Sequence, residues 1–198
     1  MKIYKNVAVA GAGGIGSFLV HYLHDFGFKR KQFDYIATTI TIFDDDIVDT
    51  TNLLHQNFSQ ADLTTLKVDV LAKRYGLDVK RRFMEEKDFQ KFDLVCCCVD
   101  SMVFRKQLYT YAFQNPKFEF IDGRCTSRKG LVTNNEIPES ELTKFISDSQ
   151  ERGSCLLQQE KENKTAHVLP AIIAAMMTQV FLNKTRGDSN LYEKHVNL

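Results

Sequence analysis

An α/β domain with a mostly parallel sheet is the fold class that the sequence predicts, and three observations predict it. Short apolar runs alternate along the chain with segments whose apolar residues recur at helical spacing. A glycine-rich loop, residues 11–16, joins the first apolar run to the first helical segment. The chain has 43% hydrophobic and 26% charged residues but only 3 prolines, which excludes fibrous and low-complexity classes.

In chain order, strands and helices are expected to alternate. The strand segments are short and apolar or β-branched, as buried parallel strands are, and they cover residues 6–10, 36–43, 77–83, 94–99 and 118–122, with 130–133 as one more. The helical segments carry apolar residues with a helical period, and they cover residues 15–26, 62–75, 102–113 and 166–182. Gly76 and Pro116 end the second and third helices. The last helix is apolar on most sides, so we expect it to be buried.

All of residues 1–198 are expected to form one domain, as the length suggests. Residues 136–164 interrupt the alternation, because they are polar and show no clear period beyond one short helix near 139–149. They are expected to form a long excursion, and such excursions are often functional. The last dozen residues are expected to form a loose tail.

Charge, apolarity and cysteine content exclude several classes of protein. Lysine and arginine number 26 against 25 acidic residues, so no nucleic-acid partner is expected. The longest apolar run, 168–182, is too short to cross a membrane and contains Pro170. Five cysteines, three of them consecutive at 96–98, form neither a disulfide framework nor a paired CxxC zinc site. The sequence therefore favours a cytoplasmic protein with free thiols.

The glycine-rich loop points to a nucleotide. Its six residues, Gly11-Ala12-Gly13-Gly14-Ile15-Gly16, fit G-x-G-x-x-G between a predicted strand and a predicted helix. Glycine lets the backbone approach a phosphate, and the helix N-terminus offers free N–H groups. Asp44 directly follows the second strand, where an acid accepts ribose hydroxyls. These features leave NAD, FAD and ATP open.

A further polar set favours ATP over a dinucleotide. Asn52 and Gln56 follow the acidic turn, Lys67 lies within the second predicted helix, and Asp100 follows the fourth strand. Ligands of open α/β sheets bind at the carboxyl ends of strands, so Gly11, Asp44 and Asp100 should converge on one crevice. Lysine neutralises phosphate charge, and a carboxylate beside phosphate oxygens suits Mg²⁺.

Taken in order, these motifs resemble the ThiF/MoeB/HesA family of adenylating enzymes, which are related to ubiquitin-activating enzymes. The match runs from the glycine loop through Asp44-x-Asp46, Asn52-Leu53-x-His55-Gln56 and Lys67 to Asp100-Ser101, over about the first 135 residues. The resemblance implies a Rossmann-like ATP-binding domain, usually a homodimer, that uses ATP and Mg²⁺. The C-terminal carboxylate of a small ubiquitin-like or sulfur-carrier protein would attack the α-phosphate of ATP. Pyrophosphate would depart, and an acyl-adenylate would form.

The resemblance also implies a role for each matching residue. Those that hold the nucleotide are Gly11, Gly13, Gly14, Gly16, Asp44, Asn52, His55, Gln56, Lys67, Asp100 and Ser101. Lys67 would stabilise charge as pyrophosphate departs, Asp100 would bind the metal ion, and Arg105 fits an arginine that the family places five residues further on. Cys155, in a polar stretch at the place of the family's crossover-loop cysteine, would take the acyl group as a thioester. An inert surface cysteine is the competing interpretation.

The sequence departs from the family pattern in three places. His55 replaces an arginine, and histidine carries at most half a charge near neutral pH. The given sequence starts at the first strand, so we expect the arginine that the family carries on an N-terminal helical extension, and that reaches the partner subunit, to come from a partner protein or from one of Lys29, Arg30 and Lys31. With no CxxC pair, the chain resembles the compact branch found in bacteria, plasmids and phages.

Two other functions stay open at this point. An NAD(P)-binding oxidoreductase would use the glycine loop and Asp44, but it would leave Asn52, Gln56 and Lys67 unexplained, and no Tyr-x-x-x-Lys pair for hydride transfer is present. A catalytically degenerate nucleotide-binding partner module would account for His55 and the missing arginine. Arg124 and Arg128 are weaker candidates for orienting a carboxylate partner.

Overall fold

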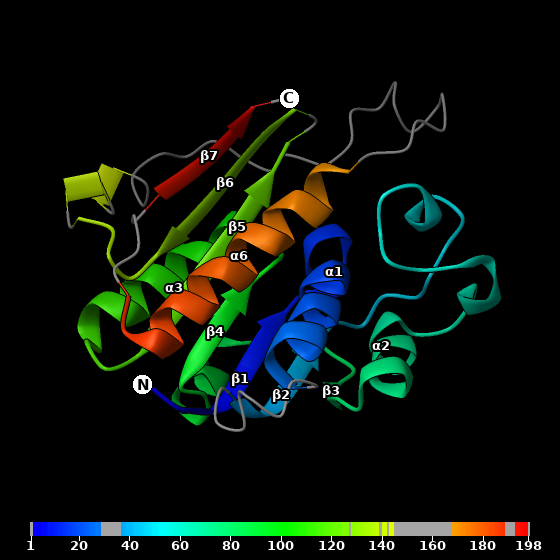
Figure 1. Cartoon of the computed structure of the whole chain (residues 1–198), viewed down its shortest axis with the longest axis horizontal. Helices are drawn as coiled ribbons and strands as arrows, with labels where there is room; N and C mark the ends of the chain where they lie inside the picture. Colours follow the sequence, from blue (N-terminus) through cyan, green and yellow to red (C-terminus); the bar gives the residue numbers. More distant parts are fainter. Residues whose placement is uncertain are drawn as a thin grey trace.

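The computed structural model describes residues 2–28, 37–126, 128–138, 140–141, 143–144, 168–188 and 193–197. Over these residues the chain forms a seven-stranded sheet in the order β3-β2-β1-β4-β5-β6-β7 (Figure 1). The strands are β1 Tyr4–Ala10, β2 Ala37–Phe43, β3 Asp78–Lys80, β4 Leu94–Cys97, β5 Glu119–Cys125, β6 Lys129–Asn134 and β7 Glu193–Asn197. The first five strands are mutually parallel, whereas β6 and β7 are antiparallel to their neighbours.

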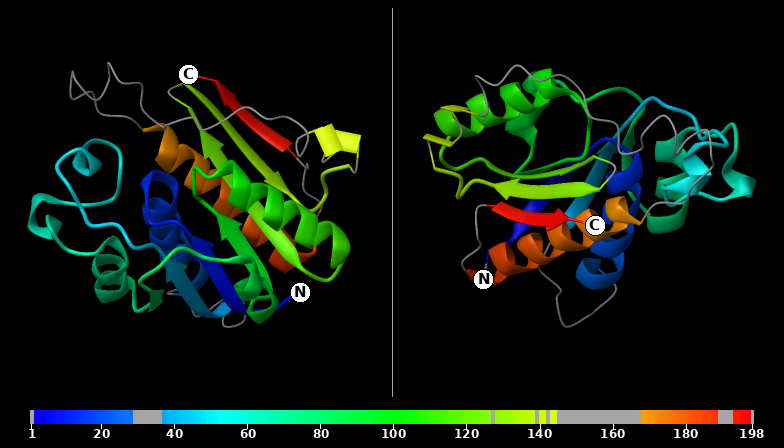
Figure 2. Two further views of the ribbon diagram at one scale, coloured as in Figure 1. Left: turned by 180° about the vertical axis from the view of Figure 1, so that it is seen from behind. Right: turned by 90° about the horizontal axis from the view of Figure 1, so that it is seen from above.

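Helices cover both faces of this sheet. Helices α1 (Gly14–Leu23), α2 (Lys67–Tyr75) and α6 (Leu169–Arg186) lie on one face, and α3 (Met102–Gln114) lies on the other (Figure 2). Short helical turns occupy His24–Phe28, Asn52–Leu54, Gln60–Asp62 and Glu86–Lys91. The predicted fold class, a Rossmann-like α/β domain with a mostly parallel sheet, is confirmed.

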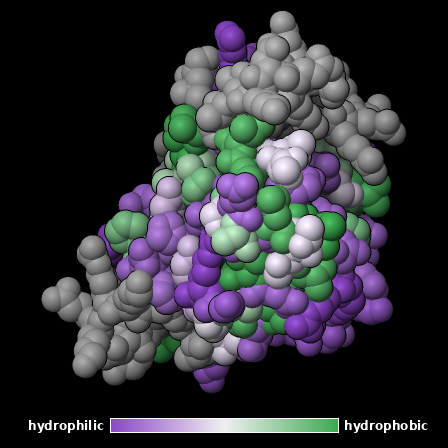
Figure 3. Space-filling model, turned by 90° about the vertical axis from the view of Figure 1, so that its right-hand side faces the viewer, coloured by the Kyte–Doolittle hydropathy of each residue, from purple (hydrophilic) through white to green (hydrophobic). Residues whose placement is uncertain are grey.

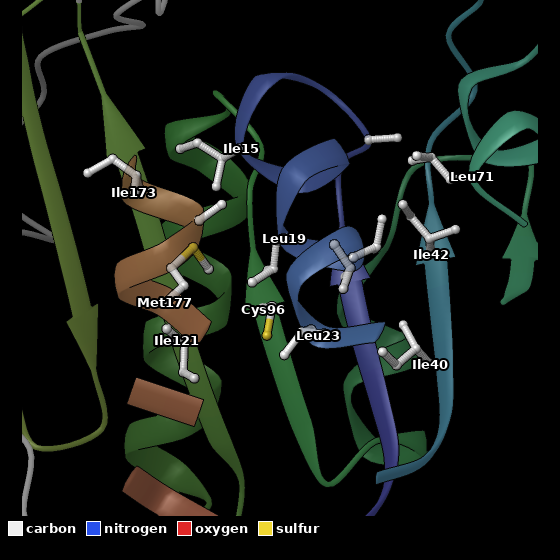
Figure 4. Close-up of a cluster of buried hydrophobic side chains, with 14 of the residues drawn as sticks. Ile15, Leu19, Leu23, Ile40, Ile42, Leu71, Cys96, Ile121, Ile173 and Met177 are labelled. Carbon is white, nitrogen blue, oxygen red and sulfur yellow. The ribbon is translucent and has the colours of Figure 1, made fainter. Parts of the chain in front are cut away.

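Two apolar layers hold the helices to the sheet. On the first face, Leu19 and Leu23 of α1 and Met177 of α6 pack over Cys96 and Ile121 (Figure 4). On the second face, the ring of Phe89 and the buried side of α3 cover β1, β4 and β5. Burying a side chain of this size contributes about 1.5–3 kcal/mol. On the side of α2, hydrophobic residues also reach the surface between hydrophilic ones (Figure 3).

The structure corrects several predicted boundaries. The helix expected over 62–75 begins only at Lys67, because the preceding turn places Thr64 in a left-handed conformation with φ of 66°. The strand expected over 77–83 is reduced to Asp78–Lys80. The expected loose tail contains β7, whose backbone pairs with β6. Most of the excursion at 136–164 lies outside the described residues.

None of the helices in the described ranges combines the length and the apolarity that crossing a bilayer requires.

Candidate functional site

A cleft of about 800 Å³ opens at the carboxyl ends of the parallel strands. β1 lies between β2 and β4, so the chain leaves β1 toward one side of the sheet and later returns to the other. Such a switch in strand order is where open α/β sheets bind ligands. The predicted site residues that line the cleft are Gly11, Gly13, Gly14, Asp44, His55, Asp100, Ser101 and Arg105.

The glycine loop is packed tightly on one side and open on the other. Gly11 has a φ of 95°, which favours glycine, and a Cβ there would stand 3.0 Å from the Cys98 carbonyl oxygen. A Cβ on Gly16 would stand 1.9 Å from the Gly11 carbonyl oxygen. A Cβ on Gly13 would meet nothing within 4 Å. Gly11 and Gly16 therefore allow the turn to form, and Gly13 leaves space in the cleft.

Asp44 fixes this loop to the end of β2. Its Oδ2 accepts the Ala12 N–H over 2.6 Å, and its Oδ1 accepts the Asp46 N–H over 2.8 Å. Burial raises the pKa of Asp44, while these backbone N–H groups and Lys67 oppose the shift. Each carboxylate oxygen has a further lone pair, so Asp44 can hold the loop and still accept a hydroxyl from a ligand in the cleft.

Lys67 does not line the cleft itself but contacts Asp46, which does. It is the first residue of α2 rather than the middle of a helix, and its buried Nζ donates to Asp46 Oδ2 over 2.8 Å. Asp46 lines the cleft, whereas Lys67 is not part of its wall. Lys67 therefore places a buried positive charge directly behind an acidic residue of the site.

Three other predicted residues, Gly16, Asn52 and Gln56, do not line the cleft. The side-chain oxygen of Asn52 accepts the Asp49 N–H over 3.0 Å and so closes a turn. Gln56 Nε2 lies 3.4 Å from Nε2 of His55, which is in the wall. The buried Oε1 of Gln56 has no hydrogen-bond partner among the described residues. Gln56 thus sits behind His55 with an unsatisfied acceptor.

Carboxylates in the cleft wall and beside it form two possible sets of ligands for a cation. Asp100 is exposed at the carboxyl side of β4, and the next residue, Ser101, caps α3 by accepting the Phe104 N–H over 3.3 Å. Asp44, Asp45 and Asp46 each offer an oxygen, and these oxygens lie within 4.8 Å of one another. Asp100 is not in that group. Carboxylates are the ligands that Mg²⁺ prefers together with phosphate, so this donor set fits it.

Arg105 belongs to a buried ionic network at the floor of the cleft. Its Nε donates to Asp122 Oδ1 over 3.0 Å, and its Nη2 donates to the carbonyl oxygens of Val99 and Gly123. Fully buried Asp122 also accepts from the Tyr109 hydroxyl over 2.7 Å and from Arg124 Nε over 2.8 Å. These partners, with the coulombic effect of Arg105 the largest, outweigh desolvation and lower the pKa of Asp122 to about 2.

The sequence interpretation missed two parts of the wall. Arg124 was ranked low but lines the cleft, as does the segment 83–87 with its exposed Phe83. Segment 83–87 follows β3, and the carboxyl end of a predicted parallel strand was the available signal for it. Val103 and Gln107 of α3 also line the cleft.

Of the three consecutive cysteines, Cys96 and Cys97 are core residues, whereas Cys98 is only partly buried. Cys96 and Cys97 are buried in β4, and burial raises the pKa of Cys96 to about 12, which makes it a poor nucleophile. Cys98 and Cys125 line the cleft. Cys155 and the basic residues Lys29, Arg30 and Lys31 lie outside the described residues.

Comparisons with solved structures show the same fold. MccB from E. coli aligns with a TM-score of 0.71 at 18% identity, over 98% of this chain and 59% of its own. PaaA gives 0.68 at 15% identity, over 98% and 61%. TcdA from E. coli, a tRNA N6-threonylcarbamoyladenosine dehydratase, gives 0.66 at 16% identity, over 92% and 86%. The chain thus spans about three fifths of the length of MccB and PaaA.

A search of curated proteins finds no sequence match. The family comparison is decisive: the model of the ThiF family matches residues 4–197, which is nearly the whole chain. Fold, glycine loop and cleft agree with that match. The chain belongs to the ThiF family and has its nucleotide-binding, adenylyltransferase-like fold.

Proposed function

We propose that the protein adenylylates the C-terminal carboxylate of a small ubiquitin-like or sulfur-carrier protein, with ATP and Mg²⁺. The observation that carries the proposal is one cleft lined by the glycine loop, by Asp44 and by Asp100. In this proposal the glycine loop holds the phosphates, Asp44 accepts the ribose hydroxyls and Asp100 serves the metal ion. Family membership supports the same reaction class.

The protein's contribution to this reaction is positioning and charge neutralisation. The substrate carboxylate oxygen forms a bond to the α-phosphorus, the bond from that phosphorus to the bridging oxygen breaks, and pyrophosphate leaves with the electron pair. Gly13 and Gly14 present the N-terminus of α1 to the phosphates, and Asp44 holds the ribose. Positioning and electrostatic stabilisation supply most of the rate in such a step.

The acidic residues of the cleft would hold the metal ion, Asp100 first and Asp46 as a second carboxylate. Bound Mg²⁺ neutralises phosphate charge. Asp46 is held by the Lys67 ammonium over 2.8 Å, which keeps its carboxylate in a fixed place at the site. Asn52, His55 and Gln56 form the adjoining loop, and His55 is the member that reaches the cleft wall.

Structures of relatives give independent support for the ligand. MccB has been solved with ATP, and with AMPCPP together with MccA; TcdA has been solved with AMP. By analogy, an adenine nucleotide and a peptide or small-protein partner suit this chain. We also propose a homodimer and a cytoplasmic location, as for family relatives.

Thermal unfolding with different nucleotides tests the proposal. A ligand that binds only the native state raises the unfolding midpoint with concentration. ATP is expected to raise it in a Mg²⁺-dependent manner, whereas NAD and NADP are expected to have no effect. A shift with NAD alone would contradict the proposal and would move the protein to the oxidoreductases.

Thioester formation at Cys155 is the next proposed step: the Cys155 thiolate sulfur forms a bond to the acyl carbon of the adenylate, the bond from that carbon to the phosphate oxygen breaks, and AMP leaves. The Cys155→Ser variant is expected to retain ATP–pyrophosphate exchange with the carrier and to lose any thioester that gel electrophoresis detects without reductant. Cys125→Ser is the matched control, because Cys125 is buried at the cleft. A thioester that persists in Cys155→Ser excludes Cys155.

One observation favours a second candidate, a nucleotide-binding module without turnover. His55 stands in the cleft wall at the position where the family pattern has arginine. A protein that binds ATP tightly but shows no pyrophosphate exchange with any carrier would favour this candidate.

A further inference from the structure

Lys67 and Asp46 form an ion pair between a buried charge and an exposed one. Lys67 Nζ donates to Asp46 Oδ2 over 2.8 Å, and the Lys67 side chain is 6% exposed whereas that of Asp46 is 58% exposed. The backbone N–H of Lys67 also donates to the Asp46 carbonyl oxygen over 2.9 Å. Two hydrogen bonds therefore fix the start of α2 to the acidic turn, and the Lys67 ammonium contacts the carboxylate of that turn.

The carboxylate of Asp46 separates this ammonium from the cleft. Asp46 lines the cleft, and Lys67 does not. Among the residues that the structure describes, Lys67 engages Oδ2 of Asp46, and Oδ1 accepts no hydrogen bond. A ligand in the cleft therefore meets the Asp46 carboxylate, with one oxygen available, and not the ammonium behind it.

The other charges that act on Lys67 are acidic as well. Burial raises the pKa of Asp44, and the charge of Lys67 is among the effects that oppose this shift. At Asp49, desolvation is outweighed by hydrogen bonds from Thr51 and Asn52 and by the charge of Lys67, so the pKa is lowered. Three carboxylates thus lie in the field of one ammonium, and they disfavour a nucleotide phosphate that arrives without a metal ion.

We infer that Asp46 holds Lys67 away from the nucleotide until a metal ion binds, and that Asp46 then exchanges the ammonium for the metal ion while Lys67 turns to a phosphate oxygen. The inference rests on the proposed function and adds Asp46 as the positioning residue of Lys67. Mg²⁺ binds to one or two carboxylates together with phosphate oxygens. A buried ammonium needs an anionic partner, and the phosphate that accompanies the metal ion supplies one.

The test measures how much Lys67 contributes to nucleotide binding with and without the metal ion. AMPCPP is titrated into the wild-type protein and into Lys67→Met, in EDTA and in Mg²⁺, and amide NMR shifts give the dissociation constants. In EDTA the two proteins are expected to bind AMPCPP within about twofold of each other, because Asp46 holds Lys67. In Mg²⁺ the variant is expected to bind at least about tenfold more weakly, the usual effect of losing a hydrogen bond between charged groups.

Replacing Asp46 should remove this dependence on the metal ion. When Lys67→Met is added to Asp46→Asn, AMPCPP binding is expected to weaken at least about tenfold in EDTA as well, since Lys67 in Asp46→Asn is free to reach the phosphate. Asp46→Ala, which leaves no oxygen to hold Lys67, is expected to give the same result as Asp46→Asn.

Asp49→Asn is the matched control. It removes a carboxylate whose charge acts on Lys67 without a hydrogen bond to it, and the Asn side chain keeps an oxygen that can accept from Thr51. In this variant the effect of Lys67→Met is expected to depend on Mg²⁺ as it does in the wild-type protein.

Two results would overturn the inference: an effect of Lys67→Met that is the same in EDTA and in Mg²⁺, or an effect that still requires Mg²⁺ in folded Asp46 variants. Both leave nucleotide binding intact, so they refute the inference and not the proposed function. A wild-type protein that does not bind AMPCPP even in Mg²⁺ contradicts the proposed function, and the inference with it. The comparison of the wild type with Lys67→Met needs no change at Asp46, so it decides the question even where an Asp46 variant does not fold.

Discussion

Gly16 approaches Gly11 so closely that a Cβ on Gly16 would stand 1.9 Å from the Gly11 carbonyl oxygen. The first turn of α1 is therefore packed directly on the end of β1. Gly13, in the same loop, has no neighbour within 4 Å of the place of a Cβ, and it lines the cleft. Two glycines three residues apart thus have different physical roles, one in packing and one in leaving space.

Alanine at these two positions should separate folding from ligand binding. Gly16→Ala is expected to lower the free energy of unfolding by about 1–3 kcal/mol, because the loop has to move, and to lose ATP binding. Gly13→Ala is expected to unfold like the wild type but to bind ATP more weakly, since its methyl group occupies the cleft. Thermal unfolding with and without ATP and Mg²⁺ measures both effects. Normal folding and normal ATP binding in Gly16→Ala would contradict this account of the loop.

Replacing Lys67 should remove activity while the fold is kept. Pyrophosphate exchange in Lys67→Ala is expected to fall about 10²–10³-fold, the usual effect of losing one preorganised charge. Asp46, the partner of Lys67, has a 58% exposed side chain and can be hydrated after the change, so stability should change little. Lys73→Ala, exposed on the same helix, is the control. If exchange survives in Lys67→Ala, the assigned site is wrong.

Arginine at position 55 should strengthen binding of the triphosphate. Arginine is charged at every working pH and binds phosphate oxygens in a fork, whereas histidine is at most partly charged near neutral pH. His55→Arg is expected to raise ATP affinity by up to about tenfold and to leave AMP affinity unchanged. Calorimetric titration with both nucleotides measures the difference. An equal gain for AMP would place residue 55 away from the β- and γ-phosphates.

The Asp122 network should make stability depend on acid pH. Two arginines and Tyr109 lower the pKa of Asp122 from 3.8 in the unfolded chain to about 2 in the fold. The folded state therefore favours the ionised form, and its contribution is complete above about pH 4 and is lost as the pH falls toward 2. The shift corresponds to a stability contribution on the order of 2 kcal/mol.

Urea unfolding of the wild type and of Asp122→Asn measures this contribution. At pH 7 the variant is expected to be less stable by about 3–5 kcal/mol, because buried Arg105 and partly buried Arg124 lose their shared counter-ion. The gap between the two proteins should narrow as the pH falls from 4 to 2. A gap that stays constant over this range would show that Asp122 is not ionised in the fold.

Much of the fold could be predicted because its signals are local. The apolar run before Gly11, the period of the first helix and the β-branched second strand depend only on neighbouring residues, and the structure confirms these elements. The predicted tail was wrong because β7, with charged Glu193 and Lys194, is a strand only through its backbone pairing with β6. The predicted start of the second helix was wrong for a similar reason. Residues 62–66 continue the helical period of apolar residues, but Thr64 lies in a turn with positive φ, so α2 begins only at Lys67.

The residues of the candidate site also fall into two groups, those that local sequence signals identify and those whose contacts only the fold creates. Gly11, Asp44 and Asp100 were identified because each directly follows a strand, and parallel strands end at one edge of a sheet. Arg105 was identified from the family pattern and lines the cleft, and its described hydrogen bonds go to Asp122 and to two backbone carbonyls. No spacing in the sequence relates Arg105 to Asp122, since strand β5 brings them together across 17 residues.

By itself the sequence determined the class of fold, the glycine loop, the strand-end residues and the family, because turn geometry and periodicity are encoded by residues close together in the chain. Only the tertiary structure decided which of these residues line the same cleft. It separated His55, which reaches the cleft, from Asn52 and Gln56, which do not, and it paired Lys67 with Asp46. It also showed that Arg124 faces the cleft, because the direction of a side chain depends on buried partners far away in the sequence.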